Sequence, residues 1–102
     1  MHIRGIRMAE FYSERLDRLI DAIGSMKEKA ELYAFLTELC SIKELHDLSV
    51  RLQVCELLNE GLNYRDISER VGISPATISR IYRSFSRGSG GILRAIELLE
   101  SK

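Results

Sequence analysis

The stretch YRDISERVGISPATISRIYR, Tyr64–Arg83, has the pattern of two short helices joined by a tight turn. Its apolar side chains recur at three- and four-residue spacings within each half. Such spacing places them on one face of each helix, where the two helices can pack together. The side chains in question are Ile67, Val71, Ile78 and Ile81.

The residues between the two halves suit a sharp turn. Gly72 permits the left-handed backbone that ends a helix abruptly, and Ser68 is small where the helices would cross. Ser74 is a favourable N-cap, and Pro75 then takes the first helical position, where a missing N–H is harmless. The stretch 64–83 therefore predicts a helix-turn-helix.

The second helix of this unit, 75–87, has two contrasting faces. Ile78, Ile81, Tyr82 and Phe85 fall on one side and are expected to point inward. The opposite side has three arginines, three hydroxyls and no acid: Ala76, Thr77, Ser79, Arg80, Arg83, Ser84 and Arg87. Arginine can bridge two guanine acceptors, hydroxyls reach phosphates or base edges, and small side chains allow close approach to thymine methyls.

Local charge agrees with contact to double-stranded DNA. The whole chain is neutral, but residues 63–87 carry five arginines and two acids. A basic footprint on the reading unit is what phosphate binding requires, whereas an ordinary solvated face, the alternative, usually mixes signs. The predicted DNA-binding residues are Arg65 on the first helix, Ser74 at the cap, and Ala76, Thr77, Ser79, Arg80, Arg83, Ser84 and Arg87 on the second.

Length and composition favour a single helical domain over residues 1–102 in the cytoplasm. The chain is 45% hydrophobic and 29% charged, and it has neither an apolar run of membrane-spanning length nor a signal-peptide pattern. Cys40 and Cys55 lie in apolar helical patterns, which favours buried free thiols over a disulfide. His2 and His46 stand apart from other metal-ligand residues, so no metal site is expected.

The remaining sequence predicts helices and no strand. A first helix has apolar residues from Tyr12 to Ile23 and should stop at Gly24. The patterns Ser25-x-x-Glu28 and Ser41-x-x-Glu44 are capping boxes that would open a second helix and a third, the latter ending near Asn59. After glycines at 88, 90 and 91, a short final helix follows. The expected fold class is all-α with six helices.

The third helix has two apolar stripes rather than one. Leu45, Leu48, Leu52 and Cys55 form the first, and Val50, Val54, Leu57 and Leu58 form the second, on the far side. Two stripes indicate a helix covered on both sides. Either the first, second and last helices of the same chain wrap it, or a partner subunit covers one face. The second possibility suits a major-groove reader, since such proteins commonly pair two units.

The block SIKELHDLSVRLQVCELLNEGLNYRDISERVGISPATISRIYRSF, 41–85, with the glycine-rich joint and last helix after it, resembles the tryptophan repressor superfamily. It is especially similar to the shorter Trp-repressor-related proteins of Gram-positive bacteria. The specific marks are Arg51, the Gly72 turn and the run Ala76-Thr77-Ile78-Ser79-Arg80. The resemblance implies an intertwined homodimer, with dimerisation helices at about 9–60 and 91–100.

The resemblance also implies a possible ligand pocket. In the family, two arginines sandwich the indole of L-tryptophan, and their counterparts here are Arg51 and Arg80, with Ser84 and Ser41 at neighbouring positions. The family has glycine where this chain has Ile81, and a branched side chain there would fill the indole cavity. We therefore expect no cofactor and no response to L-tryptophan, and Arg51 would instead pair with Glu44 or Asp47. Another small-molecule effector is not identified by the sequence.

These observations favour a homodimeric, sequence-specific DNA-binding regulator that acts as a repressor and binds palindromic operator DNA through helix 75–87. The alternative is a dimeric interaction module whose helix-turn-helix docks a protein partner. An enzyme is not expected, because the sequence has no nucleophile–base set, metal cluster, carboxylate pair or phosphate loop.

Overall fold

The computed structural model describes residues 2–3, 6–7 and 13–102. Contacts divide the chain into two compact units, Met1–Ser41 and Ile42–Lys102. Near the amino terminus, β1 (His2–Ile3) pairs antiparallel with β2 (Ile6–Arg7). The sequence pattern did not predict these strands, because two-residue segments are too short to show an alternation.

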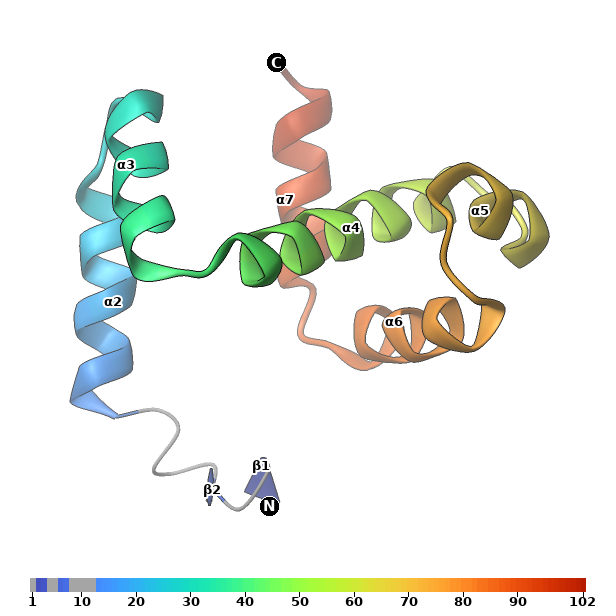
Figure 1. Ribbon diagram of the computed structural model, residues 1–102, viewed down its shortest axis with the longest axis horizontal. Helices are drawn as coiled ribbons and strands as arrows, with labels where there is room; N and C mark the ends of the chain where they lie inside the picture. The colour runs from blue at the N-terminus through green and yellow to red at the C-terminus, as the bar shows by residue number, and fades with distance from the viewer. Residues whose placement is uncertain (1, 4–5, 8–12) are drawn as a thin grey trace. The chain divides into compact units, whose positions relative to one another are not determined.

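The first unit contains two helices, α2 (Glu14–Ser25) and α3 (Lys29–Leu39) (Figure 1). The predicted capping box at Ser25 is wrong. Ser25 is the last residue of α2, and its hydroxyl donates to the carbonyl of Asp21 at 2.7 Å. A serine in a last turn can bond a carbonyl four residues back, and here that bond takes the place of a cap. Glu28 is the N-cap of α3 and makes no side-chain capping bond.

The second unit contains four helices: α4 (Ile42–Asn59), α5 (Tyr64–Val71), α6 (Pro75–Arg87) and α7 (Gly91–Glu100) (Figure 1). With α2 and α3 they make six helices within residues 13–102, which confirms the all-α class. The predicted start of α4 after Ser41 and its end at Asn59 are also confirmed.

The helix-turn-helix forms as predicted from its capping residues. Gly72 has φ 80° and caps α5 in the left-handed region. Ser74 accepts a hydrogen bond from the N–H of Thr77, and Pro75 occupies the first turn of α6. The hydroxyl of Ser68 donates to the carbonyl of Ile73 at 2.6 Å. Ser68 therefore connects α5 to the turn by a hydrogen bond, besides being small where the two helices would cross.

A small core joins α4 to the helix-turn-helix. Val54 and Leu57 of α4 are buried against Ile67 of α5 and Ile78 of α6. The second stripe of α4 is therefore covered by this chain's own helices. The covering helices belong to the same chain, but they are α5 and α6 rather than the first, second and last helices that the stripe pattern suggested.

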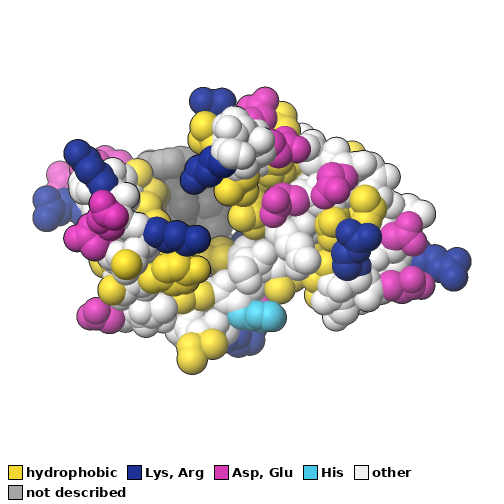
Figure 2. Space-filling model, turned by 90° about the horizontal axis from the view of Figure 1, so that it is seen from above, with side chains coloured by type: hydrophobic (Ala, Val, Ile, Leu, Met, Phe, Trp, Pro, Cys, Tyr) yellow, Lys and Arg dark blue, Asp and Glu magenta, His cyan; other side chains and the backbone are white. Residues whose placement is uncertain are grey.

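Apolar side chains remain exposed elsewhere. In the second unit Ile42 is 89% exposed and Leu48 is 53% exposed on α4, and three leucines of α7 are exposed as well: Leu93, Leu98 and Leu99. In the first unit Ile20, Tyr33 and Leu39 are exposed, and α2 and α3 contain no buried residue. Figure 2 shows hydrophobic side chains at the surface among charged ones.

Both cysteines are free. Cys55 is buried, and burial raises the pKa of its thiol. Cys40 is only half-buried, so the expectation of two buried thiols is right for Cys55 and wrong for Cys40. Across the described residues, no helix combines the length and the apolar character needed to cross a bilayer.

Candidate nucleic-acid interface

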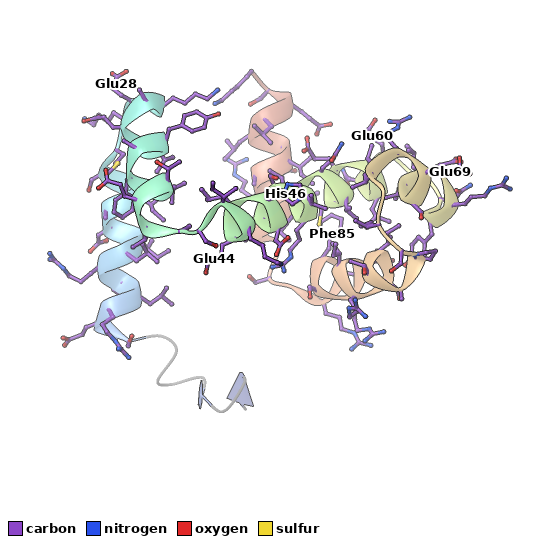
Figure 3. The ribbon with its side chains drawn as sticks, in the orientation of Figure 1. Glu28, Glu44, His46, Glu60, Glu69 and Phe85 are labelled. Atoms are coloured by element: carbon purple, nitrogen blue, oxygen red, sulfur yellow. The ribbon has the colours of Figure 1, made fainter. Side chains whose placement is uncertain are left out.

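One face of α6 is held against the core and the opposite face is exposed. Ile78 is fully buried, and Phe85 is half-buried and points from α6 toward α4 (Figure 3). At about 100° per residue, the side chains farthest from Ile78 are the exposed Ala76, Arg80, Arg83 and Arg87. The structure thus brings the three predicted arginines of α6 onto one exposed arc.

Tyr82 departs from the expected inward position. It is 45% exposed, and its ring meets that of Tyr64 edge-on, with centroids 6.4 Å apart. Tyr64 begins α5 and packs against the core cluster, so the ring pair connects α5 to α6. The residue lies at the boundary of the apolar face, where helical spacing alone does not decide burial.

The predicted hydroxyl residues lie at the first turn and along the flanks of α6. Thr77 and Ser79 are half-buried, whereas Ser74 and Ser84 are exposed. The Ser74 and Thr77 hydroxyl oxygens are 3.0 Å apart, and the Thr77 N–H donates to Ser74 Oγ at 3.2 Å. The first turn is therefore fixed by side chains as well as by the helix itself.

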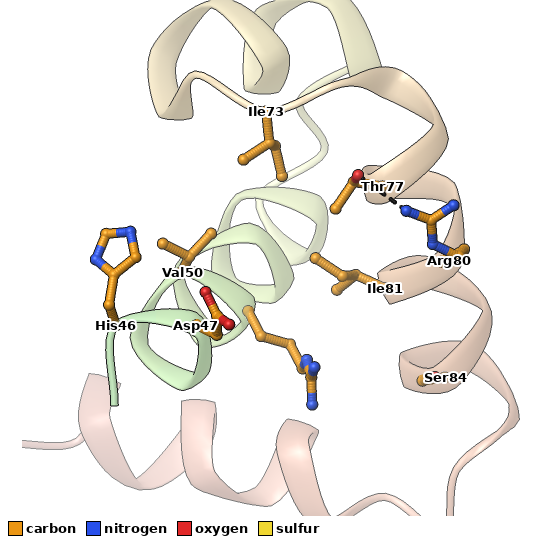
Figure 4. Close-up of a pocket in the computed structure, with 9 residues that line it drawn as sticks. His46, Asp47, Val50, Ile73, Thr77, Arg80, Ile81 and Ser84 are labelled. Carbon is orange, nitrogen blue, oxygen red and sulfur yellow. Dashed lines mark hydrogen bonds between the residues drawn. The ribbon is translucent and has the colours of Figure 1, made fainter. Parts of the chain in front are cut away.

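Arg80 joins this first-turn network. Its Nη2 donates to Thr77 Oγ1 at 3.1 Å, and Figure 4 shows the side chain bending toward Thr77. Helical spacing places residues three apart on the same side, so this bond could have been predicted from the sequence.

Arg65 stands apart from the α6 arginines, on α5. It is exposed, and its Nε lies 3.4 Å from Glu69 Oε1. A surface pair of this length constrains the guanidinium weakly, so Arg65 can change partner. Asn63, which the sequence reasoning missed, caps this helix by accepting from the N–H of Asp66 at 2.9 Å. Asparagine is a preferred N-cap, so that signal was present in the sequence.

A cavity of about 520 Å³ lies between α4, the turn and α6 (Figure 4). Three of the four residues implied by the family resemblance line it, namely Arg51, Arg80 and Ser84, whereas Ser41 does not. Ile81 forms part of the wall, beside Val50 and Ile73. The space therefore persists next to Ile81, and its volume falls in the range of small-molecule sites.

Charged groups of α4 that the sequence reasoning did not assign to a pocket also line this cavity. His46 and Asp47 are among the lining residues. Asp47 forms its ion pair with Lys43, at 2.8 Å, rather than with Arg51. The hydrogen bond from Lys43 lowers the pKa of Asp47, and the charges of His46 and Arg51 lower it further. At neutral pH the cavity wall therefore carries a carboxylate beside its arginines.

The helix order, the caps of the helix-turn-helix and the position of the cavity can be compared with known proteins. The family model of the Trp repressor protein matches residues 14–100. The chain belongs to this family. Members of this family are DNA-binding regulators and not enzymes, and this chain is therefore a DNA-binding regulator.

Individual relatives agree with this assignment. The uncharacterised protein YerC of Bacillus subtilis (strain 168) is 38% identical over 84 residues, which cover 82% of this chain and 81% of YerC. A TrpR-like protein from Eubacterium eligens ATCC 27750 is similar in structure with a TM-score of 0.85 and 38% identity, over 90% of this chain and 95% of that one. A candidate Trp repressor from Staphylococcus aureus has a TM-score of 0.84 and 32% identity, over 95% and 97%.

Proposed function

We propose that this protein is a repressor that binds palindromic operator DNA as a homodimer and reads the sequence with α6. The observation that carries the proposal is the exposed arc of α6, which has three arginines and no acid within Pro75–Arg87. The helix is also rigidly held, because Ile78 is fully buried and Ser74 caps the first turn. A basic, small-residue helix face on a fixed support suits a major groove.

The exposed side chains divide by their reach. Arg83 and Arg87 are long and exposed, and they suit guanine edges, while Ala76 suits close approach to a thymine methyl. Arg65 lies on the preceding helix, which in helix-turn-helix proteins crosses the backbone. Arg65 is therefore proposed as a phosphate contact, made by exchanging its weak pair with Glu69 for a phosphate.

A second copy of this chain would supply the other half-site. The exposed apolar residues Ile42 and Leu48 of α4 and the leucines of α7 offer a surface that water covers poorly. The first unit also has apolar residues that its own helices do not cover, since α2 and α3 bury no residue. Pairing two chains through these surfaces would place two copies of α6 for a symmetric operator.

Operator binding is further proposed to be independent of L-tryptophan. Ile81 packs against the core cluster and takes up part of the wall where the family has glycine. This contact lets Ile81 itself support α6 against the core. A different small molecule in the remaining cavity is compatible with this proposal.

Selection of bound DNA from a random pool by the purified protein tests the function directly. We expect a palindromic consensus with half-sites about one helical turn apart. Arg83→Ala should change the consensus, whereas Arg94→Ala on α7 removes the same charge away from α6 and should leave it unchanged. Recovery of no preferred sequence would contradict the proposal and would favour a helix-turn-helix that docks a protein.

A further inference from the structure

A hydrogen-bonded chain of three side chains spans the first turn of α6. Ser74 Oγ lies 3.0 Å from Thr77 Oγ1, and Thr77 Oγ1 accepts from Arg80 Nη2 at 3.1 Å. The Thr77 N–H also donates to Ser74 Oγ, at 3.2 Å. The hydroxyl of Thr77 is therefore held from both sides along the helix.

We infer that Arg80 is a positioning residue for sequence reading, which acts by fixing the Thr77 hydroxyl, and that it is not itself a phosphate or base contact. This inference rests on the proposed DNA binding. Thr77 is half-buried, lies one turn before Arg80 and lines the cavity beside α4 together with it, so its short side chain has little reach. A short side chain reads a base edge more selectively when its direction is fixed before the DNA arrives.

The donor inventory explains why arginine is needed. A threonine hydroxyl has one proton and two acceptor lone pairs. With Arg80 donating to Thr77 Oγ1, the hydroxyl proton of Thr77 is left for Ser74 Oγ or for an acceptor on a base. Arg80 thus biases Thr77 toward donating, which favours a base-edge acceptor such as guanine N7 or thymine O4 over a donor.

Arg83 provides a matched comparison on the same exposed arc. Within the part of the chain that the structure describes, its guanidinium makes no hydrogen bond or ion pair, whereas that of Arg80 is bonded to Thr77. Arg80 and Arg83 are one turn apart, equal in charge and both exposed. They differ in that only the Arg80 side chain is held by a hydrogen bond within the helix. Replacing Arg80, which is bonded to Thr77, and replacing Arg83, which is not, should therefore affect sequence preference and salt dependence differently.

The test compares Arg80→Met, Thr77→Val, the double variant and Arg83→Met, each in sequence selection and in a salt titration of operator affinity. We expect Arg80→Met and Thr77→Val to relax the same half-site position by about 2- to 12-fold, which is the range for one lost single hydrogen bond. The double variant should be no worse than either alone, because both remove one unit. Thr77→Ser keeps the hydroxyl and should retain the preference.

The salt dependence separates positioning from phosphate contact. Loss of one phosphate contact makes the slope of log K against log salt less steep by about 0.9. We expect no such change for Arg80→Met. A less steep slope for Arg80→Met with an intact consensus would overturn the positioning role. Additive effects of Arg80→Met and Thr77→Val would overturn it too. Both outcomes would leave the proposed DNA binding intact. If the wild-type protein selects no sequence at all, the proposed function fails and this inference fails with it.

Discussion

Replacement of Ile78 by alanine should remove a large part of the stability of the second unit. Ile78 is 0% exposed and packs with Val54, Leu57 and Ile67, the cluster that joins α4 to the helix-turn-helix. The change deletes three carbons, worth about 0.8 kcal/mol each in transfer free energy. The cavity left behind adds to this, so we expect a loss of about 3–4 kcal/mol. A typical domain has about 5–15 kcal/mol in total.

Urea unfolding followed by circular dichroism at a fixed protein concentration measures this change. Concentration must be fixed because a dimer is stabilised by mass action. Arg83→Ala on the same helix is the control, and as an exposed substitution it should stay within about 0.5 kcal/mol of wild type. A loss below about 1 kcal/mol for Ile78→Ala, with an unchanged slope against urea, would refute the view that this cluster holds α6 in place.

Three further predictions concern the ligand, the assembly and one carboxylate. Millimolar L-tryptophan should leave the melting temperature unchanged for the wild type, and Ile81→Gly is the variant in which a rise could appear, since binding at 100 times Kd would add about 2.7 kcal/mol. Light scattering should give twice the 11.7 kDa chain mass, and Leu48→Asp should shift the mass toward one chain, whereas a monomeric wild type at micromolar concentration would rule out the homodimer. In NMR titrations Lys43→Met should raise the pKa of Asp47, because the Lys43 hydrogen bond is the main cause of its lowering. A lowered pKa means that the stabilisation by this pair is present above the unfolded pKa and is lost as the pH falls through the folded one.

The helix-turn-helix could be predicted in detail because its signals are local. Gly72, Ser74 and Pro75 each have a conformational preference that acts within one or two residues, and all three preferences agree. Ser25 shows the limit of such signals. The same serine can cap a following helix or bond the preceding turn, and the structure has the second arrangement.

The arrangement around α4 could be predicted only in part. Periodicity identified two apolar stripes, but it does not say which neighbour covers each. Val54 and Leu57 are covered by α5 and α6 of the same chain, while Leu48 on the other stripe remains exposed. Similarly, no local pattern marks His46 as a cavity residue, because the cavity depends on how α6 returns alongside α4.

The division of α6 into a packed side and an exposed side bears on how regulators of this kind diversify. Ala76, Arg83 and Arg87 take no part in the core, so exchanging them for other side chains should have little effect on folding. If α6 reads operator DNA as proposed, exchange of these three residues would change the preferred sequence on an unchanged scaffold. Ser74, Thr77 and Arg80 are the exception, since their bonds to one another mean that a productive change at one of them requires matching changes at the others.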